Sequence, residues 1–249
     1  MKYQEGTDRP VILFDLDGTL LPMDTEAFEK VYFEGLCRYM SEFSPRELIG
    51  YVWEGTKAMV QNNGTRTNRE AFAECFSKCS GKDYYQMEDH FLQYYETSFQ
   101  DCRNACNISE RSRKIVHTLK RKGYKVAVAT NPIFPRIATE SRIRWIGLEP
   151  DEFLLVTTFE NSTCAKPNLH YYQEVCGKLG VAPKDCIMVG NDVEEDGCAS
   201  SLGIRVMLVT DCLLNKKGLP MESFESGSLE QLLDWAEALP EYRESEERR

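Results

Sequence analysis

Two aspartates near the start of the chain, Asp15 and Asp17, are separated by one residue and directly follow the apolar run 10–14. Carboxylates this close repel one another unless a cation neutralises them. Oxygen ligands of this kind suit a hard divalent cation, and Mg2+ takes one or two carboxylates together with phosphate oxygens and water. The pair therefore predicts a magnesium site that can also handle a phosphate group.

Polar side chains with a similar placing recur at three later points in the chain. Taken alone, each is typical of a turn or of a solvated surface. Together they gain meaning, because each follows or lies near an apolar run typical of a buried strand. A threonine hydroxyl and a lysine ammonium suit a phosphoryl group, and acids add affinity for a cation. The residues are Thr130 and Asn131; Lys166, which Pro167 keeps out of a helix; and Asn191, Asp192 and Asp196.

The elements that must position these groups alternate along the chain. This alternation predicts an α/β fold, with a Rossmann-like parallel sheet flanked by helices on both faces. Because the carboxyl ends of parallel strands lie along one edge, residues far apart in sequence can meet there in one crevice. We expect strands at 10–14, 125–129, 153–156, 186–189 and 206–209, and helices at 109–123, 135–145, 169–179 and 229–239.

The stretch between residues 23 and 106 differs from the rest, since it contains no clear strand. Its aromatic and apolar residues recur at spacings of three and four, which predicts about four helices. We therefore predict two domains. One is a discontinuous α/β core made of residues 1–20 and 109–249, and the other is a helical domain, residues 21–108, inserted after the first strand.

Composition narrows the possible partners and the location. Among 249 residues, 30 are Lys or Arg and 40 are Asp or Glu, so the formal net charge is −10. This acidic balance argues against a nucleic-acid partner. The sequence shows no signal-peptide pattern and no run of about 18 apolar residues, so we expect a cytoplasmic protein without a membrane partner.

Ten cysteines are present, and in a cytoplasmic protein we expect reduced thiols. Two pairs, Cys75 with Cys79 and Cys102 with Cys106, stand at helical spacing. Zinc knuckles usually have two residues between cysteines in a turn, so buried free cysteine is the better interpretation here than a zinc site.

The residues singled out above resemble the motifs of a known family. The segment 14–20, Phe-Asp-Leu-Asp-Gly-Thr-Leu, resembles the first motif of the haloacid dehalogenase superfamily. Thr130 resembles the second motif, Lys166-Pro167 the third, and the segment 190–196 the fourth. The resemblance covers the strand-bearing parts, and the helical insertion resembles the superfamily's cap in position and length.

The resemblance implies a Mg2+-dependent phosphatase that acts on a small phosphomonoester through an aspartyl-phosphate intermediate. Asp15 is then the nucleophile, and Asp17 is the general acid for the leaving alkoxide and then the general base for water. Thr130 and Lys166 complete the catalytic set. Phosphate is bound by Asp15, Gly18, Thr130, Asn131 and Lys166.

The resemblance also implies a set of ligands for Mg2+: the Asp15 carboxylate, the Asp17 backbone carbonyl and an acid of the fourth motif. The family usually has an acid directly after the glycine, but this chain has Asn191 there. We prefer Asp192 as the ligand, with Asp196 behind it, and keep Asn191 as the alternative. An amide oxygen binds a hard cation more weakly than a carboxylate, because it carries no charge.

Other functions on this fold stay open. Dehalogenases of the superfamily lack the second aspartate of the first motif, so Asp17 argues against that class. A sugar-phosphate mutase of the same superfamily and a non-catalytic binding module remain alternatives. The substrate and the oligomeric state are left open. Six side chains of the insertion are candidates for substrate contact, and we choose none of them: Tyr32, Arg38, Trp53, Lys57, Arg66 and Arg69.

Overall fold

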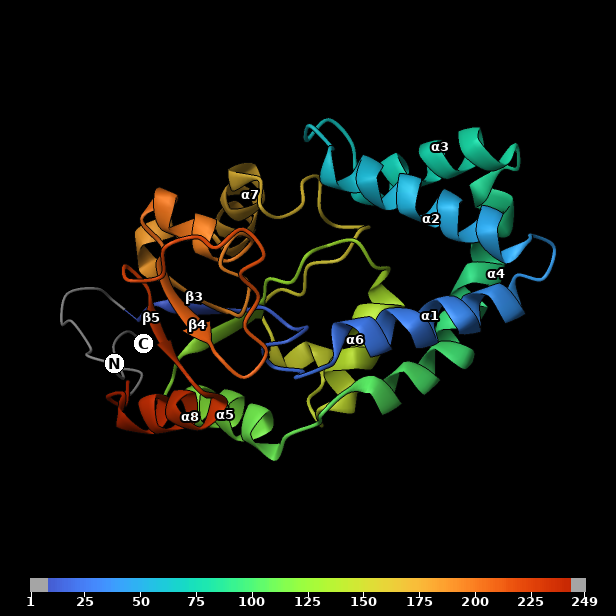
Figure 1. Cartoon of the computed structure of the whole chain (residues 1–249). Helices are drawn as coiled ribbons and strands as arrows, with labels where there is room; N and C mark the ends of the chain where they lie inside the picture. The colour runs from blue at the N-terminus through green and yellow to red at the C-terminus, as the bar shows by residue number, and fades with distance from the viewer. Residues whose placement is uncertain (1–8, 243–249) are drawn as a thin grey trace, which may run out of the picture.

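The computed structural model of the chain describes residues 9–242 (Figure 1). Within them, five strands form one sheet in the order β2-β1-β3-β4-β5, and every neighbouring pair is parallel. This confirms the expected Rossmann-like α/β fold. The strands are β1 (Val11–Phe14), β2 (Lys125–Val128), β3 (Cys186–Gly190), β4 (Arg205–Val209) and β5 (Glu225–Gly227).

Strand β1 lies at the point where the strand order reverses. It pairs with β2 on one side and with β3 on the other, and Phe14 is in register with both Val128 and Val189. The residues that follow these three strands therefore emerge side by side at one edge of the sheet. In open parallel sheets, this switch point is where ligands bind.

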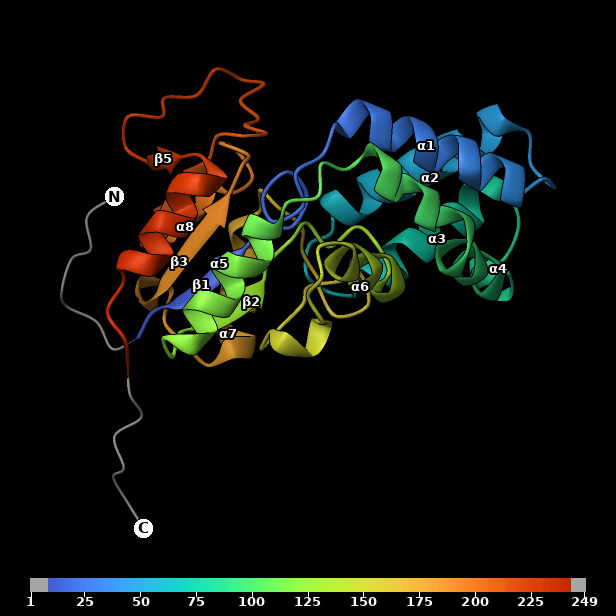
Figure 2. The same cartoon turned by 90° about the horizontal axis from the view of Figure 1, so that it is seen from below.

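Helices cover both faces of the sheet (Figure 2). On one face lie α5 (Glu110–Arg121) and α8 (Leu229–Ala238), which bury Ile115 and Trp235 in the same apolar cluster as Ile12. On the other face lie α7 (Leu169–Leu179) and the 3-10 helix η4 (Gly197–Leu202), which belong to the cluster of Leu13 and Met188. Strands β1 to β4 are largely buried, as their continuous apolar runs predict.

A separate group of helices follows β1 and lies beside the sheet, as Figures 1 and 2 both show. We call it the helical unit, residues 25–105. Its α-helices begin at well-defined caps: the Asp24 side chain accepts from the backbone of α1, and Ser44 and Glu47 form a capping box on α2. The members are α1 (Thr25–Tyr39), α2 (Pro45–Val60), α3 (Asn68–Ser80), α4 (Tyr84–Glu96) and the 3-10 helix η1 (Ser98–Ala105).

Helix α6 (Arg136–Trp145) joins the sheet to the helical unit. Trp145 stacks on Phe99 of η1 with 5.4 Å between ring centroids, and its indole nitrogen donates to the Gln100 side chain at 2.9 Å. Because α6 begins a few residues after β2, this contact links the carboxyl edge of the sheet to the inserted helices.

One expected strand is wrong. Residues 153–156 run beside β2 and exchange backbone hydrogen bonds with it, but only Val156 forms a bridge, to Val128. The 3-10 helix η2 (Pro150–Glu152) ends directly before this segment, and the Phe153 amide bonds back to Pro150. Too few extended residues remain for a regular strand. Sequence analysis also missed β5, whose three residues include a glycine and have little β-propensity.

No helix between residues 9 and 242 is both long and apolar enough to cross a bilayer.

Candidate active site

A buried lysine joins two aspartates at the switch point of the sheet. The Lys166 ammonium donates to Asp15 Oδ1 at 2.9 Å and to Asp196 Oδ1 at 2.6 Å. The lysine side chain is 1% exposed, and Asp15 and Asp196 are buried as well. Three residues spread over 182 positions of the chain, from three different loops, therefore meet at one point, as the sheet topology predicts.

Loop geometry explains why the lysine points inward. Residues 163–168 form no helix or strand, in agreement with the effect expected from Pro167. The Lys166 backbone amide donates to the Asn131 side chain at 3.2 Å, which fastens this loop to the end of β2. On the far side, Asp196 Oδ2 accepts from the amides of Asn191 and Asp192, so both oxygens of Asp196 are committed.

Negative charge exceeds positive charge in the cluster of Asp15, Lys166 and Asp196. Burial raises the pKa of Asp15; the Lys166 ammonium lowers it, and Asp196 and Asp17 raise it again, so that it ends above its ordinary value. Burial alone would lower the pKa of Lys166, but Asp15 and Asp196 raise it well above the usual range. The lysine is therefore a permanent ammonium, and one positive charge serves several carboxylates.

Asp17 lies at the mouth of the site and is held by an arginine that sequence analysis missed. The Arg142 guanidinium from α6 donates to Asp17 Oδ2, and it lies 4.4 Å from the centre of the Phe134 ring. Arg142 is 1% exposed. Among the described residues, Asp17 Oδ1 has no hydrogen-bond partner. One oxygen of Asp17 is thus held by Arg142, and the other is buried without a partner within residues 9–242.

A signal for Arg142 was present in the helical spacing. It stands four residues after Ala138 and three after Thr139, both of which are buried. These spacings place it on the inner face of α6. Its neighbours Arg136 and Arg144 made the arginines of this segment resemble an ordinary charged surface.

The fourth motif folds so that its two candidate ligands have different surroundings. Asn191 is 3% exposed; its Oδ1 accepts from the Thr19 hydroxyl at 3.0 Å and its amide donates to the Cys212 carbonyl at 2.7 Å. Asp192 uses Oδ1 to accept from the amides of Glu194 and Glu195. Both side chains border the same cavity as Asp15. The amide of Asn191 is thus tied into the fold on both sides.

Gly18 is the point where the first and fourth motifs touch. Its φ of +83° lies in the left-handed region, and a Cβ at this position would lie 2.3 Å from the Asn191 side-chain nitrogen. Only glycine satisfies both conditions. The Gly18 backbone is therefore placed by close packing against Asn191.

The second motif supplies Thr130 and Asn131 and brings in another acid that sequence analysis missed. Thr130 is 2% exposed, and its carbonyl accepts from the hydroxyls of Thr157 and Tyr171. The Asn131 amide donates to both carboxylate oxygens of Glu195 at 3.0 Å. Burial raises the pKa of Glu195 to about 8. In sequence, Glu195 was hidden within the acidic run 192–196.

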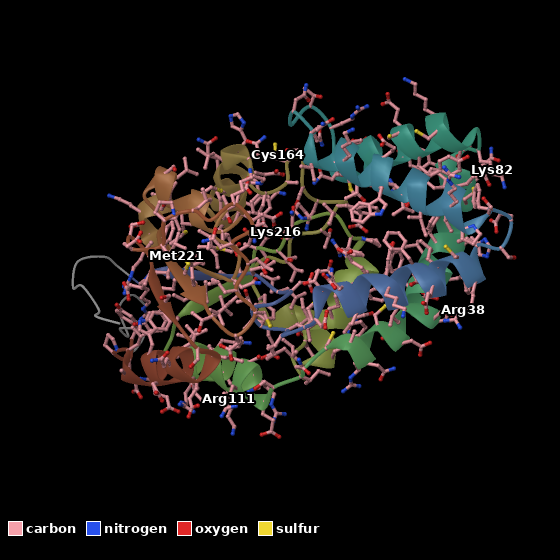
Figure 3. All side chains as sticks on the ribbon, viewed as in Figure 1. Arg38, Lys82, Arg111, Cys164, Lys216 and Met221 are labelled. Atoms are coloured by element: carbon pink, nitrogen blue, oxygen red, sulfur yellow. The ribbon has the colours of Figure 1, made fainter. Side chains whose placement is uncertain are left out.

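A cavity of about 290 Å³ opens in front of these groups. Its core end is formed by the side chains at the carboxyl edge of the sheet, including Asp15, Asp17, Thr130 and Asn131. Its other wall is formed by the helical unit. Of the six candidates named in the insertion, only Tyr32 and Trp53 border this cavity. Arg38 lies at the distant end of the helical unit (Figure 3).

The donors at the core end fit a hard divalent cation, although they do not enclose one. Between residues 9 and 242, no three His, Cys, Asp or Glu side chains converge on one metal position. Mg2+ needs only one or two carboxylates, with carbonyl, water and phosphate oxygens completing its shell. Asp15, Asp17, Asp192, Glu195 and Asp196 border the cavity, against the nearby cations Lys166 and Arg142. A further positive charge is therefore favourable here.

Comparison with known proteins assigns the class. The family model described as haloacid dehalogenase-like hydrolase matches residues 12–209, and the chain belongs to this family. This confirms the resemblance carried by the four motifs.

Individual relatives share about a quarter of their residues with this chain. The phosphoglycolate phosphatase of Haemophilus influenzae (strain 86-028NP) is 26% identical over 213 residues, which cover 82% of this chain and 87% of the relative. The glyceraldehyde 3-phosphate phosphatase of Methanothermobacter thermautotrophicus is 23% identical over 199 residues, covering 80% and 84% of the two chains. A crystal structure of a HAD phosphatase from Thermococcus onnurineus has the same fold, with a TM-score of 0.57, 20% identity and coverage of 91% and 97%.

Proposed function

We propose that this hydrolase is a Mg2+-dependent phosphatase that acts on a small phosphomonoester, with Asp15 as the nucleophile. The observation that carries the proposal is the convergence of Asp15, Lys166 and Asp196 at the switch point, with Asp17 beside them on the open side. The names of the relatives support a phosphate ester as substrate. Asp17 supports phosphate transfer over dehalogenation, because only the former has an alkoxide to protonate.

In the first step, a carboxylate oxygen of Asp15 bonds to phosphorus and the bond from phosphorus to the ester oxygen breaks. The departing oxygen keeps the electron pair and takes a proton from Asp17, whose Oδ1 has no other partner in the described structure. Lys166 holds Asp15 in place and offers positive charge to the phosphoryl oxygens. Thr130, Asn131 and the backbone at Gly18 complete the phosphate site.

In the second step, water attacks the phosphorus of the aspartyl phosphate and Asp17 takes its proton. The bond from phosphorus to Asp15 breaks, inorganic phosphate leaves, and the Asp15 carboxylate is restored. When bound, Mg2+ supplies charge that offsets repulsion between the carboxylate and the phosphoryl oxygens. Asp15, the Asp17 carbonyl and Asp192 would hold it. Asn191 is the alternative to Asp192, and Asp196 supports the loop from behind.

The helical unit would act as a cap over this centre. In this proposal residues 1–20 and 109–249 form the catalytic core and residues 21–108 form the cap. Closure of a cap excludes water while the ester is bound. Residues of the helical unit that border the cavity then contact the leaving group.

Hydrolysis of p-nitrophenyl phosphate tests the proposal. We expect turnover with Mg2+, loss of turnover with EDTA and recovery when Mg2+ is added back. No turnover in the presence of Mg2+ would favour the non-catalytic alternative. Isomerisation of a hexose phosphate without phosphate release would favour the mutase.

A further inference from the structure

The cavity has walls of opposite character, and the wall formed by the helical unit is mostly aromatic. Its rings come from four different helices, which indicates a surface built jointly and not a single helical stripe. Six of these rings are at least nine-tenths buried, and the rings of Phe33 and Trp53 are more exposed. The six are Phe28, Tyr32, Phe72, Tyr84, Phe91 and Tyr95.

Three hydroxyl groups within this wall are paired with one another or with the backbone. The hydroxyls of Tyr32 and Tyr95 lie 2.9 Å apart, and the Thr56 hydroxyl donates to the Val52 carbonyl at 2.9 Å. Burial raises the pKa of Tyr95 to about 12, so its hydroxyl is uncharged at neutral pH. What this part of the wall offers to a ligand is mainly ring surface.

Cations are missing from this wall. Within the described residues of the helical unit, the charged side chain that borders the cavity is an acid, Glu29. The basic candidates point elsewhere: Arg66 pairs with Glu74 and Arg69 pairs with Glu88. On the core side, Lys216 borders the cavity from an exposed loop, and Figure 3 places it between the sheet and the helical unit.

A leaving group that carries a carboxylate would therefore lose its hydration without gaining a partner in the aromatic wall. Removing an unpaired charge from water is costly, whereas each buried methylene is favourable by about 0.8 kcal/mol, or about 4-fold in affinity. The acids at both ends of the cavity add repulsion to that cost. The cavity volume of about 290 Å³ limits the ligand to a small molecule.

We propose that the substrate is the phosphate monoester of an uncharged, apolar alcohol, whose hydrocarbon part packs against the aromatic wall. This inference rests on the proposed phosphatase function and names its substrate class. It departs from the carboxylated substrate named for the Haemophilus influenzae relative. Specificity would come from ring surface and from the absence of a cation in the aromatic wall, and not from a dedicated polar contact.

Two esters that differ by one carboxylate provide the test of selectivity. Benzyl phosphate and 4-carboxybenzyl phosphate have similar leaving oxygens and differ mainly in charge at the far end of the ring. With Mg2+, we expect kcat/KM to be about 10-fold or more higher for benzyl phosphate, and about 4-fold higher for each methylene added from ethyl to butyl phosphate. Equal or reversed values would overturn the inference.

Variants at the cavity rim locate the effect. Trp53 borders the cavity and is 48% exposed, so Trp53→Ala should fold and lower kcat/KM for benzyl phosphate by about 10-fold while changing ethyl phosphate little. Tyr85→Ala is the matched control, since Tyr85 is 51% exposed on α4 and does not border the cavity. Glu29→Lys should improve 4-carboxybenzyl phosphate relative to benzyl phosphate, and Glu29→Gln should do so less.

Binding separates this inference from the proposed function. The Kd values of benzylphosphonate and 4-carboxybenzylphosphonate, measured by calorimetry with Mg2+, need no turnover. Tighter binding of benzylphosphonate by about 10-fold supports the apolar substrate class, even in a protein that hydrolyses neither ester. Equal binding, or tighter binding of the carboxylated phosphonate, contradicts it, even in an active phosphatase.

Discussion

The two ends of the cavity are built in different ways. At the core end, buried charged groups pair with one another: Lys166 joins Asp15 to Asp196, and Arg142 holds Asp17. At the helical end, ring surfaces face the cavity and the hydroxyls of Tyr32 and Tyr95 satisfy one another. The core end fixes atoms at defined positions, as a reaction requires. In our proposal, the helical end selects the substrate by shape and polarity.

This difference means that substitutions at the two ends should have different kinetic signatures. Changes at the core end should slow the hydrolysis of every ester, to an extent set by the chemical role of the lost group. Changes at the helical end should alter the preference among esters and leave the reaction intact.

The largest effect is expected at Asp15. Asp15→Asn replaces a carboxylate by an amide, which is too weak a nucleophile to attack phosphorus. We expect kcat to fall by about 10^4-fold or more for all esters alike. Steady-state assays with p-nitrophenyl, benzyl and ethyl phosphates measure this, with thermal unfolding as the check on folding. A folded variant with near wild-type rates would remove Asp15 from the mechanism.

Asp17→Asn should have a smaller effect that depends on the leaving group. The variant keeps Asp15 but loses the proton donor, so kcat/KM for ethyl phosphate should fall by about 10^2- to 10^4-fold. The loss should be much smaller for p-nitrophenyl phosphate, whose leaving group needs little protonation. Equal losses for both esters would contradict the assigned role of Asp17.

Two substitutions in the fourth motif should differ in how much they raise the Mg2+ concentration needed for activity. We expect Asp192→Asn to raise the Mg2+ concentration for half-maximal activity by about 10- to 100-fold, because a charged ligand is lost. Asn191→Ala should shift it less, although it removes hydrogen bonds to Thr19 and Cys212 and should lower thermal stability. The reverse order would make Asn191 the ligand. Small, equal shifts would place the metal elsewhere.

The smallest effect concerns Glu195 and the pH dependence of stability. Burial raises the pKa of this acid from 4.5 to about 8 in the folded protein. Its contribution to stability is therefore present at low pH and is lost as pH rises from about 4.5 through about 8. Gln does not titrate, so the Tm of Glu195→Gln should rise relative to that of the wild type over this range. The expected relative rise is at least roughly 2–4 °C, the change that about 1 kcal/mol produces at this size.

Thermal unfolding in EDTA at pH 5 and at pH 9 measures this gain. Glu194→Gln is the control, because Glu194 is the neighbouring acid and pairs with Lys217 at the surface. A Tm difference that does not change with pH, or that changes equally in the control, would show that Glu195 is not the titrating group.

The same contrast explains what the sequence could predict. Asp15 and Asp196 were predictable, because they follow β1 and β3, whose carboxyl ends lie together in the parallel sheet. Lys166 follows only the extended segment 153–156 beside β2. Arg142 acts from a helix and is one of several arginines there, so only its spacing from Ala138 distinguished it. Glu195 lay within a run of acids.

The aromatic wall was harder to predict for a physical reason. A ring at helical spacing is equally suited to a helix core and to a cavity wall. Phe76 and Tyr94 are buried in the helical unit and do not border the cavity, whereas Phe72 and Tyr95 do. Only the packing of the helices decides between these two positions. The segment 153–156 failed for a similar reason, since its apolar pattern fits an edge beside β2 without forming a regular strand.

The most direct test of the central claim is a pre-steady-state measurement on Asp17→Asn with p-nitrophenyl phosphate and Mg2+. This leaving group departs without the acid, but breakdown of the aspartyl phosphate lacks its base. We predict a burst of about one nitrophenolate per protein without matching phosphate release. Quenching and borohydride reduction should then convert residue 15 to homoserine, detected by peptide mass spectrometry. Simultaneous release of nitrophenolate and phosphate from the first turnover, with Asp15 unmodified, would contradict nucleophilic catalysis by Asp15.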